Sequence, residues 1–219
     1  MNQKFKTVIF DLDGTLTDSG IGIINTIKYS LDKMQVDYSK VDLNTFIGPP
    51  LLDSYMDVLK MTKEDGLKAI DFYQERFATI GKFENKVYDG IIDTLERLVD
   101  ANFTLLIATT KPEIFAIEIA KHFGFFKYFE VISGGSLDQK LSDKAEILDI
   151  ALNKNKTDRS SAIMIGDRMH DVIGAHKNNI PCIGVTYGYG SKQELIDSKA
   201  DYILDSPSQI ADFLIKNKL

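Results

Sequence analysis

The amino-acid sequence predicts an α/β protein in which a Rossmann-like, doubly wound and mostly parallel sheet carries an inserted all-helical domain. From Tyr88 onward, short apolar runs alternate with amphipathic stretches of helical period. This alternation is typical of parallel strands joined by right-handed helical crossovers, with helices on both faces of the sheet. Between Ser19 and about Lys82, in contrast, apolar residues recur only at helical spacing.

Each element follows from a local pattern. The β-branched and aromatic run Thr7–Phe10 indicates a buried strand. Apolar residues three and four positions apart, such as Ile23, Ile27 and Leu31, indicate helices, and Thr62 is a typical N-cap residue. Further strands are expected at 103–108, 130–133, 162–165, 182–185 and 202–204, and helices at 20–34, 51–59, from 63 toward 81, at 91–100, 112–123, 143–152, 170–178, after 191 and at 208–216.

The domain boundaries follow from the change in element type. We expect the chain to cross between two lobes near Thr17–Ser19 and again near Phe83–Val87. Residues 1–17 and 84–219 would then form the α/β core, and residues 18–83 the helical domain.

Composition narrows the class of protein. The chain has 219 residues, of which 44% are hydrophobic and 26% charged, which is typical of a globular protein. The net charge of −6 favours a small-molecule partner over a nucleic acid polymer. Cys182 is the single cysteine, so neither a disulfide nor a cysteine metal site is expected. With no apolar run long enough to span a membrane, we expect a cytoplasmic location and no membrane partner. The expected assembly is a monomer or a weak homodimer.

Two carboxylates directly follow the first strand. In Asp11-Leu12-Asp13-Gly14 the acidic residues stand one residue apart at the strand's carboxyl end, where open α/β sheets bind ligands. A calcium loop of the EF-hand kind fits poorly, because its glycine belongs at the sixth position and here it is the fourth. A solvated turn remains open from this stretch alone.

Three further polar groups are expected at the ends of other strands. They are Thr109-Thr110-Lys111-Pro112, the segment Lys140 to Lys144, and Gly166-Asp167-Arg168-Met169-His170-Asp171. The carboxyl ends of parallel strands share one sheet edge, so these residues are predicted to converge on Asp11 and Asp13.

Together these groups resemble the four motifs of the haloacid dehalogenase superfamily. The resemblance is carried by Asp11-Leu12-Asp13-Gly14-Thr15, Thr109, Lys144 and Gly166-Asp167 with Asp171, and it covers essentially the whole chain. The helical insert and the segment Phe46–Leu51 resemble the branch of phosphoglycolate phosphatases and bacterial 5'-nucleotidases. In that branch the insert is a cap domain.

The resemblance implies a Mg²⁺-dependent phosphatase of small phosphorylated metabolites. Asp11 would attack phosphorus and form an aspartyl-phosphate, and Asp13 would act as general acid and base. Magnesium would be held by the Asp11 and Asp167 carboxylates and the Asp13 carbonyl, with Asp171 contacting metal-bound water. These assignments need hard oxygen ligands close to the nucleophile, which acidic residues supply.

The same resemblance implies four phosphate-binding residues. Gly14 permits the tight loop, Thr109 donates its hydroxyl, and Lys144 supplies a cation. Lys140 competes with Lys144 for that role, but Lys144 opens the amphipathic run that follows, as in the family pattern. Thr110 stands where relatives often have asparagine, so a backbone or hydroxyl contact would replace that amide. Pro112 is expected in the first turn of a helix whose amides also face the anion.

Three further features are not assigned to the chemistry. His170 lacks a second histidine at ligand spacing and is interpreted as a lining or surface residue. Arg168 is available to pair with a carboxylate, and Tyr187-Gly188-Tyr189-Gly190 is expected to form a flexible aromatic loop near the sheet edge that could contact substrate.

Other functions are weighed against the phosphatase. Dehalogenases and phosphonatases of the superfamily lack the second aspartate of the first motif, so Asp13 disfavours both by resemblance. A phosphosugar mutase similar to β-phosphoglucomutase stays open. A phospho-accepting signalling module of the receiver type is a non-enzyme alternative, but it carries no helical insert.

The substrate is left open between phosphoglycolate and nucleoside monophosphates. A second carboxylate calls for cations and a base calls for an aromatic face. The insert offers both kinds of side chain, namely Lys28, Lys33, Arg76 and Lys82, and Tyr29, Tyr38, Phe46 and Tyr55.

Overall fold

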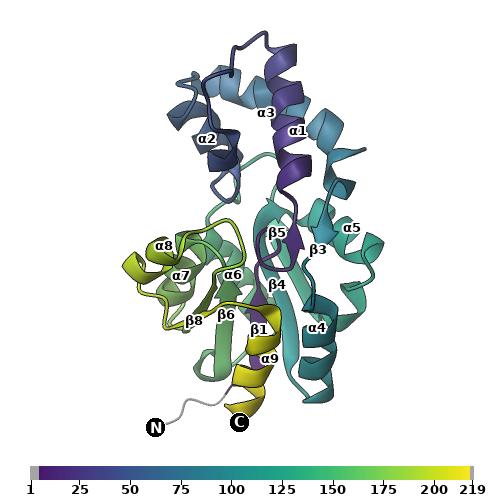
Figure 1. Ribbon diagram of the computed structural model, residues 1–219, viewed down its shortest axis with the longest axis vertical. Helices are drawn as coiled ribbons and strands as arrows, with labels where there is room; N and C mark the ends of the chain where they lie inside the picture. The colour runs from purple at the N-terminus through teal and green to yellow at the C-terminus, as the bar shows by residue number, and fades with distance from the viewer. Residues whose placement is uncertain (1–4, 218–219) are drawn as a thin grey trace. The chain divides into compact units, whose positions relative to one another are not determined.

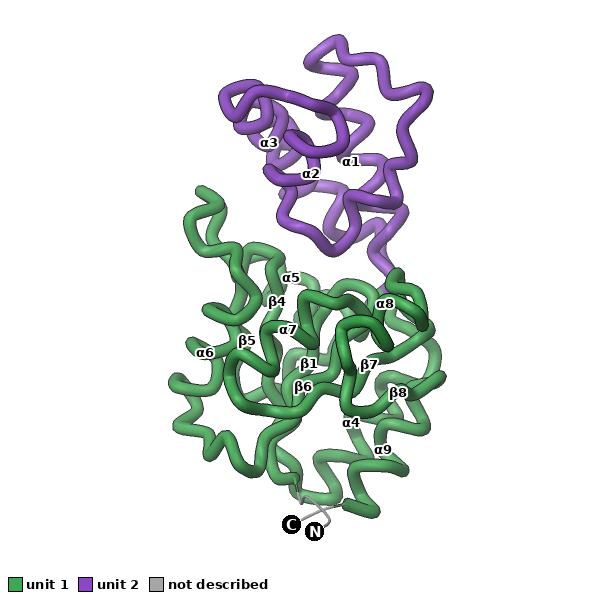
Figure 2. Tube along the Cα trace, turned by 90° about the vertical axis from the view of Figure 1, so that its left-hand side faces the viewer, with its two compact units in different colours: residues 1–17, 87–219 green, residues 18–86 purple. Residues whose placement is uncertain are grey.

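The structure, a computed structural model, describes residues 5–217. It divides into two compact units, coloured separately in Figure 2. Unit 1 comprises the described residues up to Thr17 and from Val87 onward, and unit 2 comprises Asp18–Lys86. The division after Lys86 lies slightly beyond the boundary expected from the sequence.

Unit 1 is built on a sheet of six parallel strands in the order β5-β4-β1-β6-β7-β8 (Figure 1). The prediction of a mostly parallel α/β fold is confirmed. Its strands are β1 (Thr7–Phe10), β4 (Thr104–Pro112), β5 (Val131–Gly135), β6 (Ala162–Gly166), β7 (Cys182–Val185) and β8 (Tyr202–Leu204). Its helices are α4 (Ile91–Asp100), α5 (Glu113–His122), α6 (Lys144–Lys154), α7 (Met169–Lys177), α8 (Lys192–Asp197) and α9 (Pro207–Lys216), with short 3-10 helices at Phe126–Tyr128 and Arg159–Ser161.

Alternating side chains of the central strand enter two separate cores. Val8 and Phe10 of β1 pack into a cluster with residues of α4, α5 and α9. Ile9, between them, packs into a second cluster with residues of α6, α7 and α8. Because successive side chains of a strand point to opposite faces, both faces of the sheet are covered by helices and the strands are buried throughout.

Unit 2 is helical, with α1 (Gly20–Lys33), α2 (Leu51–Asp57), α3 (Lys63–Phe77) and short 3-10 helices at Leu43–Phe46 and Gly81–Phe83. The third helix begins as predicted, since the Thr62 side chain accepts a hydrogen bond from the Asp65 amide at 3.1 Å. Arg76 of α3 forms a bidentate pair with Glu84, with N–O distances of 2.7 and 3.0 Å. This pair ties the end of the unit to its longest helix.

Several element boundaries differ from those expected. β4 continues to Pro112, so Pro112 is the N-cap of α5 and not a residue of its first turn. The ladder between β4 and β5 is irregular between Thr109 and Pro112, which explains why an apolar pattern ending at Ala108 stops too early. Two short strands, β2 (Thr17–Asp18) and β3 (Lys86–Val87), pair where the chain passes between the units. A strand of two residues is too short to produce a period in the sequence.

No helix among residues 5–217 has the length and apolar character required to cross a membrane.

A core substitution tests the two-faced packing of the sheet. Leu148 of α6 is fully buried in the second cluster. Leu148→Ala is expected to lower the free energy of unfolding by roughly 2–5 kcal/mol, because the truncation removes apolar contact and leaves a cavity. Urea denaturation followed by circular dichroism measures the change.

The matched control is Ile114→Ala, since Ile114 of α5 is 52% exposed. Its expected cost is within about 0.5 kcal/mol. Equal destabilisation by both substitutions would contradict the assignment of Leu148 to the core.

Candidate active site

The loop after β1 places its two aspartates at the carboxyl edge of the sheet. The Asp11 amide still donates to the Ile165 carbonyl of β6 at 2.9 Å, so Asp11 continues the strand ladder. The Leu12 carbonyl then accepts amides of Thr15, Leu16 and Thr17, and Gly14 adopts a φ of 81°. Glycine is the residue that adopts this left-handed conformation without steric cost. The chain therefore turns tightly just beyond the strand.

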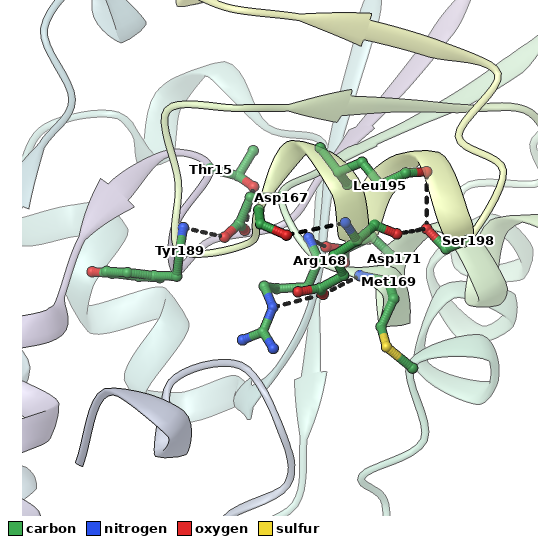
Figure 3. A network of polar contacts seen from close by, with 10 residues as sticks. Thr15, Asp167, Arg168, Met169, Asp171, Tyr189, Leu195 and Ser198 are labelled. Atoms are coloured by element: carbon green, nitrogen blue, oxygen red, sulfur yellow. Dashed lines mark hydrogen bonds and ion pairs between the residues drawn. The ribbon is translucent and has the colours of Figure 1, made fainter. Parts of the chain in front are cut away.

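Gly14 also allows the end of β6 to come close. A Cβ atom at position 14 would lie 2.3 Å from Oδ2 of Asp167. Asp167 directly follows β6 and is fully buried. Thr15 Oγ1 donates to Asp167 Oδ1 at 3.1 Å, and the Tyr189 amide donates to Oδ2 at 2.8 Å (Figure 3). Both carboxylate oxygens are thus held by donors from separate loops.

Three carboxylates meet at this edge of the sheet, and one of them is Asp11, the predicted nucleophile. Asp11, Asp167 and Asp171 each offer an oxygen, and these oxygens lie within 4.8 Å of one another. Asp171 stands in the first turn of α7, where its Oδ2 accepts the Arg168 amide at 3.0 Å. Burial, followed by the charges of Asp171 and Asp11, raises the pKa of Asp167 to about 8. Burial also raises the pKa of Asp11, although Lys144 opposes that effect.

Lys144 lies among these acids. Its Nζ is 2.8 Å from Asp11 Oδ1 and 2.7 Å from Asp171 Oδ1, and its side chain is 5% exposed. The two carboxylates keep the pKa of Lys144 above its usual value despite burial. Lys140, the competing candidate, is 86% exposed and pairs with Asp138 at the surface.

Asp13 points away from this group of acids toward a different cation. Its Oδ2 lies 2.9 Å from Nζ of Lys111, a side chain that is only 5% exposed. Its Oδ1 is buried and accepts no hydrogen bond from the described residues. The two aspartates of the loop therefore have separate surroundings, with Lys144 at Asp11 and Lys111 at Asp13.

Thr109 and Thr110 lie near the end of β4. Thr109 is buried, pairs with Gly134 of β5, and accepts the Lys111 amide on Oγ1 at 3.3 Å. The Thr110 carbonyl would lie 2.5 Å from a Cβ atom on Gly135. The α5 helix begins at Glu113, immediately after this segment.

The residues without a predicted role have structural partners. Arg168 donates through Nε to Glu194 at 2.9 Å, and the Met169 amide donates to the same oxygen at 2.8 Å (Figure 3). Burial, followed by the charge of Arg168, lowers the pKa of His170. The Tyr187 hydroxyl donates to the Thr15 carbonyl at 3.0 Å, so the aromatic loop contacts the loop after β1.

Sequence reasoning gave no role to Lys111, Thr15 or the Tyr189 amide. In the sequence, Lys111 is only one member of a polar group that follows a predicted strand. Its side chain reaches Asp13 because β4 continues to Pro112 and includes Lys111. Thr15 lies within the first motif, yet its contact to Asp167 joins residues 152 positions apart. The Tyr189 contact is made by a backbone amide, which every residue except proline has, so the residue type does not predict it.

The donor set suits a hard divalent cation. Carboxylate oxygens are the ligands that Mg²⁺ prefers, and three of them converge here with a single lysine between two of them. Burial, followed by the charges of Asp171 and Asp11, raises the pKa of Asp167, and a bound cation would offset both effects. The pair of Asp11 and Lys144 sets a carboxylate beside a positive charge, an arrangement that suits the binding of an anionic ester.

Sequence comparison agrees with this geometry. The family model for haloacid dehalogenase-like hydrolases matches residues 8–185. A 5'-nucleotidase of Pseudomonas aeruginosa is 42% identical over 193 residues, which cover 88% of this chain and 87% of that protein. The tyrosine-protein kinase PtkA of Mycobacterium tuberculosis is 35% identical, over 93% of this chain and 69% of that protein. A phosphoglycolate phosphatase of Vibrio parahaemolyticus is 28% identical, over 96% of each.

The fold is equally close to a solved structure. A protein named as a predicted phosphatase from Clostridium acetobutylicum superposes with a TM-score of 0.92 at 46% identity, covering 97% of this chain and 99% of that one. The match extends over both units. The chain belongs to the haloacid dehalogenase-like hydrolase family and is a phosphoric monoester hydrolase.

Proposed function

We propose that the protein is a Mg²⁺-dependent phosphatase of small phosphate esters that works through an aspartyl-phosphate on Asp11. The observation that carries this proposal is the Asp11–Lys144 pair of 2.8 Å within a cluster of buried acids at the carboxyl edge of the sheet. A carboxylate beside a fixed cation is suited to attack phosphorus, since the cation offsets the charge of the incoming phosphate.

The first displacement forms a bond between an Asp11 oxygen and phosphorus while the ester oxygen leaves. Asp13 donates a proton to that oxygen, which departs as an alcohol. In the second displacement Asp13 takes a proton from water, and the water oxygen attacks phosphorus to release inorganic phosphate and regenerate Asp11. Lys111 holds Asp13 Oδ2 at 2.9 Å, while the buried Oδ1 accepts no hydrogen bond from the described residues and would carry the proton that is transferred.

The phosphate and the metal would be held by neighbouring groups. Thr109, the segment at Thr110, the Gly14 loop and Lys144 would bind the oxygens that do not react. Asp11, Asp167 and the Asp13 carbonyl would hold Mg²⁺, with Asp171 contacting a metal-bound water. When bound, the ion supplies positive charge that offsets the carboxylates and the phosphate.

We also propose that unit 2 is the cap that selects the substrate. Some of its candidate cations and aromatic side chains already contact other residues of unit 2, and others are partly exposed. Arg76 is neutralised by Glu84, with its side chain 18% exposed. Phe46 and Tyr55 are buried and pack against each other with ring centroids 5.4 Å apart, so they belong to the core. Tyr29 and Tyr38 are partly exposed and bonded to Glu75 and Asp32.

Both substrate classes retain candidate residues in unit 2. Glu84 occupies Arg76, but Lys28 and Lys33 are exposed cations for a second carboxylate, and the partly exposed Tyr29 and Tyr38 remain for a base. The higher identity to the 5'-nucleotidase than to the phosphoglycolate phosphatase leads us to rank nucleoside 5'-monophosphates first.

Replacing the nucleophile tests the chemistry. Asp11→Asn is expected to lower kcat by a factor of roughly 10³ or more, because an amide cannot form the aspartyl-phosphate. Folding should persist, since Asn removes a charge that burial disfavours. Phosphate release and thermal unfolding are measured side by side.

Asp197→Asn serves as the control, because Asp197 is a surface residue of α8. Its activity should equal that of the wild type. An active Asp11→Asn variant would rule out the covalent mechanism.

The pH dependence of metal binding tests the acidic cluster. Asp167, with a pKa of about 8 in the metal-free protein, must lose its proton to bind a cation. Magnesium affinity is therefore expected to rise between pH 6 and pH 8, with proton release on binding. Calorimetric titration in buffers of different ionisation enthalpy measures both quantities.

The free energy of unfolding of the metal-free protein should fall with rising pH, whereas the magnesium affinity should rise. Between the unfolded value of 3.8 and about 8, the folded state retains a proton that the unfolded chain has lost, so stability falls as pH rises. For the binding experiment, a magnesium affinity that does not change with pH would contradict the role of Asp167 as a metal ligand.

A panel of phosphorylated metabolites tests the substrate. We expect nucleoside 5'-monophosphates to give the highest kcat/KM in a phosphate-release assay, with phosphoglycolate lower. Preference for phosphoglycolate would overturn the ranking, and an isomeric phosphosugar as product would indicate a mutase. Transfer to a protein tyrosine without phosphate release, the activity that the name of PtkA describes, would overturn the phosphatase itself.

A further inference from the structure

The loop between β7 and α8 forms a second layer behind the acidic cluster. This 186–190 loop comprises Thr186-Tyr187-Gly188-Tyr189-Gly190. It is fixed at both ends, because Thr186 donates through its amide to Leu204 at 3.1 Å and through Oγ1 to Asp205 at 2.7 Å, and Ser191 caps α8. None of these anchoring contacts involves a residue assigned to the chemistry.

The two glycines of the loop pack directly on Asp167. A Cβ atom on Gly188 would lie 2.4 Å from Asp167 Cβ and 2.3 Å from the Gly14 carbonyl oxygen, and one on Gly190 would lie 1.9 Å from the Asp167 carbonyl oxygen. Neither glycine adopts a positive φ, whereas Gly14 does. Their requirement is therefore for space and not for an unusual backbone conformation.

Hydrogen bonds complete the contact from both sides. The Tyr189 amide donates to Asp167 Oδ2 at 2.8 Å, and the Tyr187 hydroxyl donates to the Thr15 carbonyl at 3.0 Å. Thr15 in turn donates to Asp167 Oδ1 at 3.1 Å. Figure 3 shows Thr15 and Tyr189 reaching the Asp167 carboxylate. The ring of Tyr187 is fixed against Tyr88, with centroids 5.1 Å apart.

We propose that the 186–190 loop is a positioning element for the metal site: it fixes the Asp167 carboxylate directly through Tyr189 and the two glycines, and indirectly through Tyr187 and Thr15. The proposal rests on the proposed Mg²⁺ site. Groups that orient a metal ligand typically alter metal affinity by roughly 10- to 100-fold when they are changed. Orientation matters here because one oxygen of Asp167 lies within 4.8 Å of an oxygen of Asp11 and of an oxygen of Asp171, and rotation of the carboxylate would change that spacing.

Two substitutions separate the direct and indirect contacts. Gly188→Ala forces the loop or Asp167 to shift and is expected to weaken divalent metal binding by roughly 10-fold or more. Tyr187→Phe keeps the ring contact with Tyr88 but removes the hydroxyl bond to Thr15, and a loss of a few-fold is expected, as for one hydrogen bond.

Each variant has a matched control in the same unit. Gly184→Ala places a Cβ atom 2.9 Å from the Leu195 side chain and not against a carboxylate, and tests the effect of crowding a glycine. Tyr128→Phe removes the hydroxyl bond to Glu96 and tests the effect of losing a tyrosine hydrogen bond elsewhere. Both controls are expected to retain the metal affinity of the wild type.

The measurement is a titration of the metal-free protein with MnCl₂, in which free Mn²⁺ is counted by electron paramagnetic resonance and displaced with MgCl₂. Weaker binding in Gly188→Ala and Tyr187→Phe, with unchanged binding in both controls, supports the proposal. Equal affinity in a folded Tyr187→Phe and a folded Gly188→Ala overturns it, as does equal weakening in the controls. If Gly188→Ala fails to fold, Tyr187→Phe alone decides.

The wild type distinguishes this proposal from the one on which it rests. Mn²⁺ binding by the wild type that Mg²⁺ displaces keeps the proposed metal site, whatever the variants do. No binding by the wild type would overturn the metal site itself.

Discussion

The electrostatic repulsion among Asp11, Asp167 and Asp171 is the constraint on which the rest of the site depends. Like charges buried this close are unfavourable unless a cation lies between them, and Lys144 supplies one positive charge against three acids. The surrounding backbone is arranged to hold the acids together nevertheless. Gly14 and Gly166 leave no room for a side chain where Asp167 and Asp171 approach them. The excess of acids over Lys144 makes the cluster suited to a cation rather than to a stabilising ion-pair network.

The position of most site residues was predictable because the sheet is parallel. Each acidic or hydroxyl group that follows a strand must lie at one edge, and this rule brings Asp11, Thr109 and Asp167 together from distant parts of the sequence. The helix at 91–100 and the strands at 182–185 and 202–204 have the predicted boundaries. The catalytic roles of these residues remain predictions, since position alone does not establish a reaction.

The features that escaped prediction share a physical cause. Lys111 lies in a strand extension beyond an irregular ladder, where the apolar pattern has already ended. Tyr189 contacts Asp167 through its backbone amide, and Gly188 approaches Asp167 because it lacks a side chain. Neither contact can be predicted from the residue type. Arg76 carried a charge that suggested a ligand site, but Glu84 neutralises it within the same unit. Only a folded backbone reveals these pairings.

The pairing of β2 with β3 brings together the two points at which the chain enters and leaves the helical unit. Lys86 also pairs with Asp18 across this junction at 3.3 Å. Because the two ends of the insert are neighbours, its interior can lengthen, shorten or be exchanged without a change in strand order or in the loop after β1. With the proposed role of unit 2, replacement of one contiguous segment would alter substrate specificity during evolution, while the strand ends of unit 1 are inherited unchanged.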